Sequence, residues 1–194
     1  YTRLTIAAGD AAIMIATGAR GGRLPSTRIN DTGVYPKYTN PVCWYYTSFH
    51  RGHGSLNVSD AIKHSCNYFF CEMATRLTIS QIDETAKSLG LGELAGVELK
   101  ESPGYRSNAA TLLALQNRNW SMFEQLQVSI GQSVNAFTPI QLASYASTLA
   151  NAGTRYKATF LSRVVSSDYR NLVYEYTAQV LSTMTISQEA RYMY

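Results

Sequence analysis

The sequence predicts a mostly helical α/β fold with a short β-hairpin near the C-terminus. Apolar residues recur at helical spacing in three stretches, 55–77, 80–90 and 138–153. Two segments near the end, 160–165 and 171–176, alternate in the manner of paired strands. Hydrophobic residues make up 45% of the 194 positions, which is enough for a buried core and argues against disorder.

The first part of the chain is expected to hold one helix followed by a long loop region. Residues 6–17 form an apolar run that Gly18 would end. Residues 25–57 are dense in Pro, Asn, Thr, Gly and Tyr, with short strands expected around 32–38. Loops of this length in a compact domain are usually functional, so we expect a site in or beside this region.

The stretch 55–77 is expected to be helical with a break in the middle. Ser59 and Asp60 are the expected N-caps. The segment H-S-C-N, 64–67, places Ser and Asn where a helix interior disfavours them, because their side chains compete for backbone hydrogen bonds. We therefore predict that the helix breaks near His64 and Ser65.

Caps and glycines mark the elements that follow. A helix is expected from its N-cap Ser80 to Gly90, followed by the turn-rich connector 89–99. Residues 109–118 are expected to be helical, with a further turn at 119–126. Thr138, followed by proline, begins a helix that Gly153 ends. Its expected buried positions are Ile140, Leu142, Ala143, Ala146, Leu149 and Ala150. A last helix is expected to begin at Thr185 or Ser187.

The charge pattern excludes some classes of function. The 17 basic and 13 acidic residues give a net charge of +4 and are scattered without a basic run. A nucleic-acid groove would need clustered Lys and Arg beside stacking aromatics, so no nucleic-acid partner is expected. No apolar run is long enough for a transmembrane helix. The chain begins at Tyr1, not Met, and we expect it to be a piece of a longer protein.

The cysteines and histidines do not predict a metal site. The odd count of three cysteines, Cys43, Cys66 and Cys71, argues against a complete disulfide framework. His50, His53 and His64 lie near them in sequence, but the spacings C-x22-C-x4-C and H-x2-H match no common zinc pattern. We therefore expect no metal and no cofactor.

Several motifs occur in an order that resembles penicillin-binding proteins, the D,D-transpeptidases that cross-link bacterial cell walls. They are R-I-N-D-T-G (28–33), C-W (43–44), H-G-x-L-x-V (53–58), A-I-K-x-S-C-N-x-x-F (61–70), L-G-L-G-E-L-A-G-V-E-L-K-E (89–101) and I-G-Q-S-V-N-A-F-T-P-I-Q-L-A (130–143). The resemblance spans roughly 25–194 and is closest to class B, elongation-type members, whereas 1–24 match poorly. It implies that 1–194 are a partial transpeptidase domain, truncated at both ends.

The resemblance also implies a chemistry. The family combines S-x-x-K, S-x-N and K-T-G around one cleft, and the first serine is acylated by the substrate. Ser65 would then be the proton-relay serine of S-x-N, and Asn67 the amide that positions substrate. Gln132 and Ser133 would lie near the cleft as substrate-binding residues.

Two of the three motifs are absent from the sequence. No S-x-x-K occurs; aligning Tyr1 with the family puts Thr5 and Ala8 at the Ser and Lys positions. No K-T-G occurs either, and we expect it beyond Tyr194. Because loss of a catalytic nucleophile typically costs on the order of a millionfold in rate, the chain alone is predicted to be inactive.

The resemblance implies the helical part of the penicillin-binding protein and serine β-lactamase fold, with most of the antiparallel sheet contributed elsewhere. Implied partners are stem peptides ending in D-Ala-D-Ala, β-lactams, and a cell-wall elongation or division complex. The parent protein would be anchored in the cell membrane and face outward. Three alternatives stay open: a non-catalytic penicillin-binding-like module, a serine β-lactamase or β-lactam sensor, and a basic nucleic-acid binder whose affinity would depend on salt.

Overall fold

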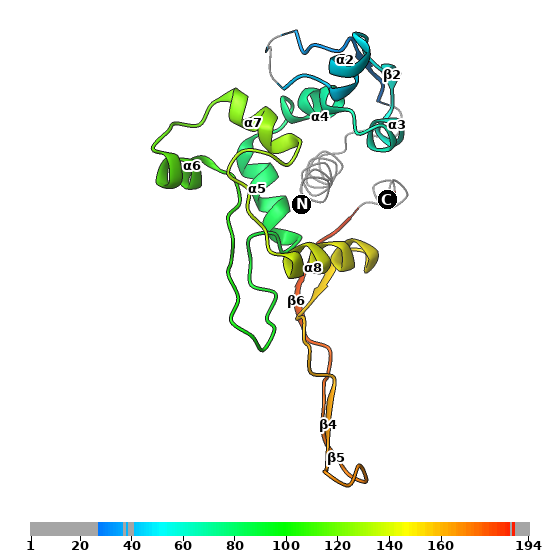
Figure 1. Ribbon diagram of the computed structural model, residues 1–194, viewed down its shortest axis with the longest axis vertical. Coiled ribbons are helices and arrows are strands. Elements are labelled where there is room, and N and C mark those ends of the chain that lie inside the picture. The colour runs from blue at the N-terminus through cyan, green and yellow to red at the C-terminus, as the bar shows by residue number, and fades with distance from the viewer. Residues whose placement is uncertain (1–26, 37, 39–40, 187, 189–194) are drawn as a thin grey trace.

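The computed structural model describes residues 27–36, 38, 41–186 and 188. Helices form the body of the molecule, and a long β-hairpin projects away from it (Figure 1). The helices are α2 (Trp44–Phe49), α3 (Val58–Lys63), α4 (Asn67–Ala74), α5 (Ile79–Ser88), α6 (Ala109–Gln116), α7 (Met122–Ser129) and α8 (Pro139–Ala150). The strands are β1 (Ile29–Asp31), β2 (Gly54–Leu56), β3 (Thr154–Tyr156), β4 (Arg163–Val165), β5 (Leu172–Glu175) and β6 (Val180–Thr183). The predicted fold class is confirmed.

Strands β1 and β2 form a short antiparallel ladder in the region that the sequence marked as loop. Ile29 lies opposite Leu56, and Asp31 lies opposite Gly54. Because side chains alternate along a strand, Ile29 and Asp31 face the interior while Asn30 faces solvent. The prediction was inaccurate here: β1 precedes the expected 32–38, and helix α2 was not expected at all.

Helices α3 and α4 replace the single broken helix expected at 55–77. The break falls where it was predicted, between the last residue of α3, Lys63, and the first of α4, Asn67. The cap was predicted wrongly, because the Asn57 side chain accepts the backbone N–H of Asp60 at 2.8 Å and is the N-cap of α3. Asn57 directly precedes Val58, the first helical residue, so its side chain reaches the free N–H of Asp60, whereas Ser59 already lies inside the helix.

Helix α4 forms the centre of the larger hydrophobic core. Its buried side chains are Tyr68, Phe69, Phe70, Cys71, Met73 and Ala74. Helix α7 packs against it through Leu126 and Val128. The buried Gln125 amide of α7 donates to the carbonyls of Ala74 and Leu77 at 2.8 and 2.7 Å, and so satisfies the C-terminal end of α4.

The connector after α5 is fixed by side chains that bind its backbone. The Glu101 carboxylate accepts the N–H groups of Ala95, Gly96 and Val97 at 2.7, 2.7 and 3.1 Å. The N-cap of the preceding helix, α5, lies two residues earlier than the predicted Ser80: it is Thr78, which forms a capping box with Gln81. The turn-rich connector itself is confirmed.

Helix α8 begins as predicted, with Thr138 as N-cap, Pro139 in the first turn and a capping box to Gln141. Its buried face was only partly predicted. Leu142 is buried and contributes with Tyr145 to a smaller second core. Ala143, Ala146 and Ala150 are exposed, because the face that packs runs through Gln141, Leu142, Tyr145 and Thr148.

The C-terminal part contains the predicted hairpin and a second strand pair. Strands β4 and β5 pair antiparallel, with Arg163 opposite Glu175, and form the projecting end in Figure 1. Strands β3 and β6 also pair antiparallel, with Thr154 opposite Thr183, and lie against α8.

Some predicted elements fall outside the described residues. The helix expected at 6–17 lies there entirely, and the last helix lies there in large part, with Gln188 described as helical. Within the described part of the chain, every helix is too short or too polar to cross a bilayer.

Candidate active site

The segment Ser65–Cys66–Asn67 is a helix-ending turn of a kind that usually needs glycine. The N–H of Cys66 donates to the Ala61 carbonyl at 2.9 Å, and the N–H of Ser65 donates to Ile62 at 3.1 Å. This pair of bonds is the Schellman pattern, which requires a left-handed residue at the first position after the cap. Ser65 occupies that position with φ 50° and is exposed. A serine accepts a backbone strain here that glycine would avoid, and such strain is concentrated at functional sites.

Residues 42–44, at the start of α2, are joined to this turn by two hydrogen bonds. The Trp44 indole N–H donates to the carbonyl of His64 at 2.9 Å. The Asn67 side-chain amide donates to the carbonyl of Val42 at 3.2 Å. Asn67 is half-buried as the first residue of α4. Its NH2 group is therefore directed toward Val42, and the turn is held in register with 42–44.

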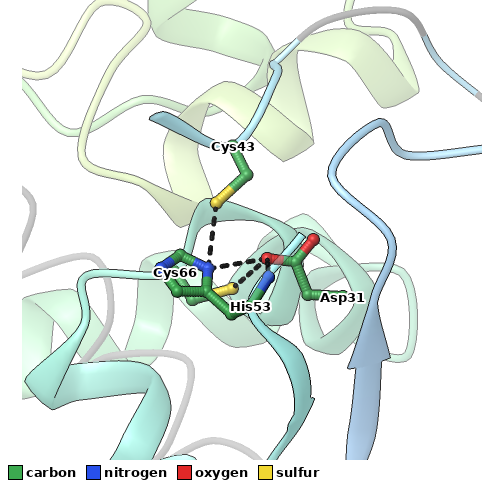
Figure 2. A group of neighbouring side chains, drawn as sticks. All are labelled: Asp31, Cys43, His53 and Cys66. Atoms are coloured by element: carbon green, nitrogen blue, oxygen red, sulfur yellow. Dashed lines mark hydrogen bonds and ion pairs between the residues drawn. The ribbon is translucent and has the colours of Figure 1, made fainter. Parts of the chain in front are cut away.

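Between these two bonds lies a cluster of four side chains from different parts of the chain (Figure 2). The Asp31 Oδ2 atom lies 2.7 Å from His53 Nδ1 and accepts the His53 backbone N–H at 3.1 Å. The Cys66 thiol donates to the same oxygen at 3.3 Å, and Cys43 Sγ lies 3.5 Å from His53 Nδ1. The other Asp31 oxygen accepts the N–H of Gly33 at 2.6 Å.

Burial and hydrogen bonding shift the pKa values of this cluster. Burial alone would raise the pKa of Asp31, but hydrogen bonds from His53, Gly33 and Cys66 outweigh it and lower that pKa below its ordinary range. Interaction with the neighbouring Cys66 thiol lowers the pKa of Cys43. The same interaction, together with burial, raises the pKa of Cys66. The two neighbouring thiols are therefore shifted in opposite directions, Cys43 downward and Cys66 upward.

The cluster has the donor set of a tetrahedral zinc site. One carboxylate oxygen, one imidazole nitrogen and two sulfurs lie within 4.8 Å of one another, from Asp31, His53, Cys43 and Cys66. Sulfur and imidazole nitrogen are the ligands that zinc prefers, and four is its usual coordination number in structural sites. Spacing along the chain predicted no metal. That prediction remains untested, but spacing is a poor guide here because the β1–β2 ladder and the α2 turn, not one local loop, gather these residues.

Aromatic rings enclose the histidine of the cluster. The ring of Tyr45 stacks on that of His53, with 4.3 Å between centroids, and the His64 ring lies at 5.6 Å. A pocket of about 300 Å³ is lined by Tyr45, Arg51, Gly52, His53, Leu56 and His64. Within the described residues, His53 Nε2 is buried without a hydrogen-bond partner. The pocket begins next to the turn that carries Ser65.

Gln132 and Ser133 lie in the turn after α7, where their interactions are with that helix. The Ser133 hydroxyl donates to the Glu124 carboxylate at 2.7 Å, and Arg118 pairs with the same buried carboxylate. The backbone N–H of Gln132 donates to Gln127 at 2.8 Å. Among the described residues, none of these bonds reaches the Ser65 turn. The positions of Thr5 and Ala8 lie outside the described part of the chain.

Comparison with known sequences identifies the family. A sequence model of the penicillin binding protein transpeptidase domain matches residues 12–193. The chain belongs to the penicillin-binding protein transpeptidase family. The matched range includes both the Ser65 turn and the start of α8 at Thr138.

Relatives within this penicillin-binding protein family are peptidoglycan D,D-transpeptidases by name. The chain is 35% identical over 104 residues to MrdA of Acinetobacter baumannii, covering 53% of this chain and 16% of that protein. It is 29% identical over 147 residues to MrdA of Haemophilus influenzae, covering 73% of this chain and 22% of that protein. The chain thus spans only a small part of the length of these relatives.

Solved structures of penicillin-binding proteins share the fold. PBP2 of Pseudomonas aeruginosa superposes with a TM-score of 0.76 at 20% identity, covering 99% of this chain and 42% of that one. PBP2 of Helicobacter pylori gives a TM-score of 0.72 at 18% identity, covering 96% of this chain and 32% of that one. The fold prediction drawn from the motif order is confirmed.

Proposed function

We propose that the chain is the S-x-N-bearing part of a peptidoglycan D,D-transpeptidase, which cross-links wall stem peptides by serine acyl transfer and binds penicillin. Family membership supports the class of enzyme, and the names of the relatives support the reaction. The nucleophilic serine and lysine of S-x-x-K, and the K-T-G strand, would come from positions outside the described residues or from further chain.

The backbone of Ser65 is the observation that carries this proposal. An exposed serine at φ 50° replaces the glycine that the Schellman turn prefers. A residue with a Cβ atom is unfavourable at this position, and the exposure of Ser65 leaves its hydroxyl available to a neighbouring nucleophile. Ser65 would pass a proton between the nucleophile and the leaving group, as general acid–base groups do.

Asn67 would position the substrate peptide. Its NH2 group is held by the Val42 carbonyl at 3.2 Å, which directs the amide oxygen away from Val42. An oxygen with a fixed direction can accept a peptide N–H of the stem peptide at little entropic cost. Gln132 and Ser133 remain candidates for the cleft edge, with Ser133 oriented by Glu124.

The partners and location follow from the same proposal. A Helicobacter pylori relative of the fold was solved in complex with MreC, and another neighbour belongs to a peptidoglycan synthase complex. We propose that the parent protein takes part in such a wall-building complex, binds D-Ala-D-Ala stem peptides and β-lactams, and is anchored in the cell membrane with this domain facing outward.

We also propose, in place of the expected absence of metal, that Asp31, Cys43, His53 and Cys66 bind one zinc ion. The donor set fits, since two thiols, an imidazole and a carboxylate already converge. The ion would supply structural cross-linking and no chemistry of its own. Because Cys66 is the middle residue of S-x-N and Cys43 lies beside Val42 and Trp44, such a cross-link would fix the turn that presents Ser65.

A labelled-penicillin gel tests the transpeptidase proposal. The full-length protein, including the segments expected on both sides, should form a covalent band that unlabelled penicillin competes away. The chain of residues 1–194 alone should form none, since it lacks S-x-x-K. A full-length protein that folds yet forms no band would favour the alternative of a non-catalytic module, and rapid hydrolysis of penicillin would favour a β-lactamase.

Metal analysis of purified full-length protein tests the zinc site. One zinc per chain is expected, with loss in Cys66→Ser and retention in the matched variant Cys71→Ser. Zinc at about a hundred times its Kd should add roughly 2.7 kcal/mol to the free energy of unfolding. Equal zinc content in both variants would contradict the assignment.

A further inference from the structure

Two of the three cysteines, Cys43 and Cys66, lie together in the core beside the S-x-N turn. Their sulfurs lie within 4.8 Å of each other. Both side chains are buried, at 1% and 0% exposure. They come from sequence positions separated by α2, β2 and α3, so tertiary folding alone brings them together.

The third cysteine belongs to a different environment. Cys71 lies on α4, where its sulfur is 3.8 Å from the Ser129 hydroxyl of α7 and 4.0 Å from the Leu126 carbonyl. The Cys71 side chain therefore contacts helix α7. The two other thiols lie beside Asp31 and His53. Cys43 and Cys66 are therefore neighbouring thiols, and Cys71 lies in a separate part of the core.

Two hydrogen bonds join the segments that carry Cys43 and Cys66. The Trp44–His64 bond lies on one side of the pair and the Val42–Asn67 bond on the other. Cys43 and Cys66 are both N-cap residues with extended backbone, at φ −64° and φ −79°. The two segments are thus tied together next to the pair, and a disulfide requires the two sulfurs to close from this separation to about 2.05 Å.

We propose that Cys43 and Cys66 are a site of oxidative modification, at which an intramolecular disulfide forms when no metal is bound. The co-reactant is a small disulfide such as oxidised glutathione. One cysteine thiolate attacks it and releases one glutathione thiol; the second then attacks the mixed disulfide and releases another. Two protein thiols become one disulfide, and the two electrons and two protons leave on two glutathione molecules.

The disulfide and the metal exclude each other, because both use the same two sulfurs. The competition between disulfide and metal rests on the zinc site proposed above. The persistence of the disulfide rests on the proposed outward-facing location, since disulfides persist in oxidising compartments. The disulfide would also remove the Cys66 thiol from Asp31, whose Oδ2 now accepts it at 3.3 Å. Asp31 would keep its bonds from His53 and Gly33.

Mass spectrometry of the full-length protein tests the site. Reduced protein is first freed of metal with a chelator, then incubated with oxidised glutathione, with or without zinc. The metal-free sample should lose two hydrogens in intact mass and yield a peptide pair that joins Cys43 to Cys66. Zinc at about a hundred times its Kd leaves only about 1% of the protein metal-free, so the rate should fall about a hundredfold.

Variants make the test specific. Cys43→Ser and Cys66→Ser should each abolish the joined peptide, whereas Cys71→Ser should retain it. A disulfide that contains Cys71, a stable glutathione adduct without an internal bridge, or oxidation at equal rate in zinc-loaded protein would each overturn the inference. Zinc content measured in the same samples keeps the two proposals apart: protein that binds no zinc but still joins Cys43 to Cys66 supports the modification site and rejects the metal.

Discussion

The indole N–H of Trp44 donates to the backbone carbonyl of His64 at 2.9 Å, one residue before Ser65. Trp44 is 45% exposed, so its contribution to the core is small, and besides this hydrogen bond its ring makes edge contacts with Tyr45 and His53. The Trp44 side chain therefore holds the turn in which Ser65 adopts a left-handed backbone conformation. The motif C-W of the sequence has this bond as its physical basis.

Replacing Trp44 by Phe should remove this hydrogen bond without emptying the core. We expect a loss of about 1 kcal/mol in the free energy of unfolding, the typical value of one hydrogen bond. In the full-length protein, penicillin acylation should slow by about tenfold, which corresponds to ~1.4 kcal/mol in the barrier. Denaturant titration and stopped-flow acylation would measure the two effects.

Trp120 offers the matched control for this prediction. Its indole nitrogen is buried without a hydrogen-bond partner among the described residues, so Trp120→Phe removes ring area but no hydrogen bond. Acylation per folded molecule should be unchanged in this variant. If both tryptophan variants slowed acylation equally, the Trp44–His64 bond would have no special role.

Gln141, the glutamine of the T-P-I-Q segment, has a structural role. Its amide nitrogen donates to the carbonyls of Glu93 and Pro103 at 2.8 and 2.9 Å, and the side chain is fully buried. Gln141→Ala would leave these carbonyls without a donor, so we expect a destabilisation of about 2–3 kcal/mol. Gln116→Ala, an exposed position at the end of α6, should change the free energy of unfolding by less than about 0.5 kcal/mol. Equal urea midpoints for the two variants would refute this role.

The Tyr35 hydroxyl makes stability depend on alkaline pH. Burial, reinforced by the hydrogen bond to Glu72 at 2.7 Å, raises the pKa of Tyr35 to about 12 from its ordinary 10.0. A raised pKa means that the contribution is fully present below pH 10 and is lost as pH rises toward 12. The stability advantage over Tyr35→Phe should therefore shrink by about 1–2 kcal/mol across this window.

Urea titrations at several pH values from 8 to about 11.5 would measure this difference. Tyr169→Phe is the control, because that side chain is 84% exposed. Its effect on stability should be the same at every pH. A Tyr35→Phe difference that stayed constant with pH would show that the hydroxyl remains protonated, or is ionised equally, in both states.

Features that depend on neighbouring residues were predictable from the sequence. Thr138 followed by Pro139 specified the start of α8, and the alternation at 160–165 and 171–176 specified the β4–β5 hairpin. The helix break at Ser65 also followed from local preference, since serine and asparagine disfavour helix interiors. Ordered motifs then gave the family, which the match over 12–193 confirmed.

The four-residue cluster could not be predicted in the same way. Asp31 reaches His53 only because the β1–β2 register sets Asp31 opposite Gly54, and Cys43 reaches Cys66 only because α2 brings 42–44 against the turn. Neither the register nor α2 left a signal in the periodicity of 25–57. Ligand spacing detects metal sites built on one loop, and this cluster draws on four separate segments.

The most direct measurement is the rate of penicillin acylation in full-length protein with changes at the S-x-N turn. Ser65→Ala should slow acylation by about 10²–10⁴-fold, the usual range for a lost proton-transfer group. Asn67→Ala should slow it by about 10²-fold through loss of substrate positioning, and melting should stay cooperative in both variants. Ser59→Ala, an exposed serine of α3, should acylate at the parent rate. Unchanged acylation in folded Ser65→Ala and Asn67→Ala proteins would contradict the assignment of this turn to the transpeptidase active site.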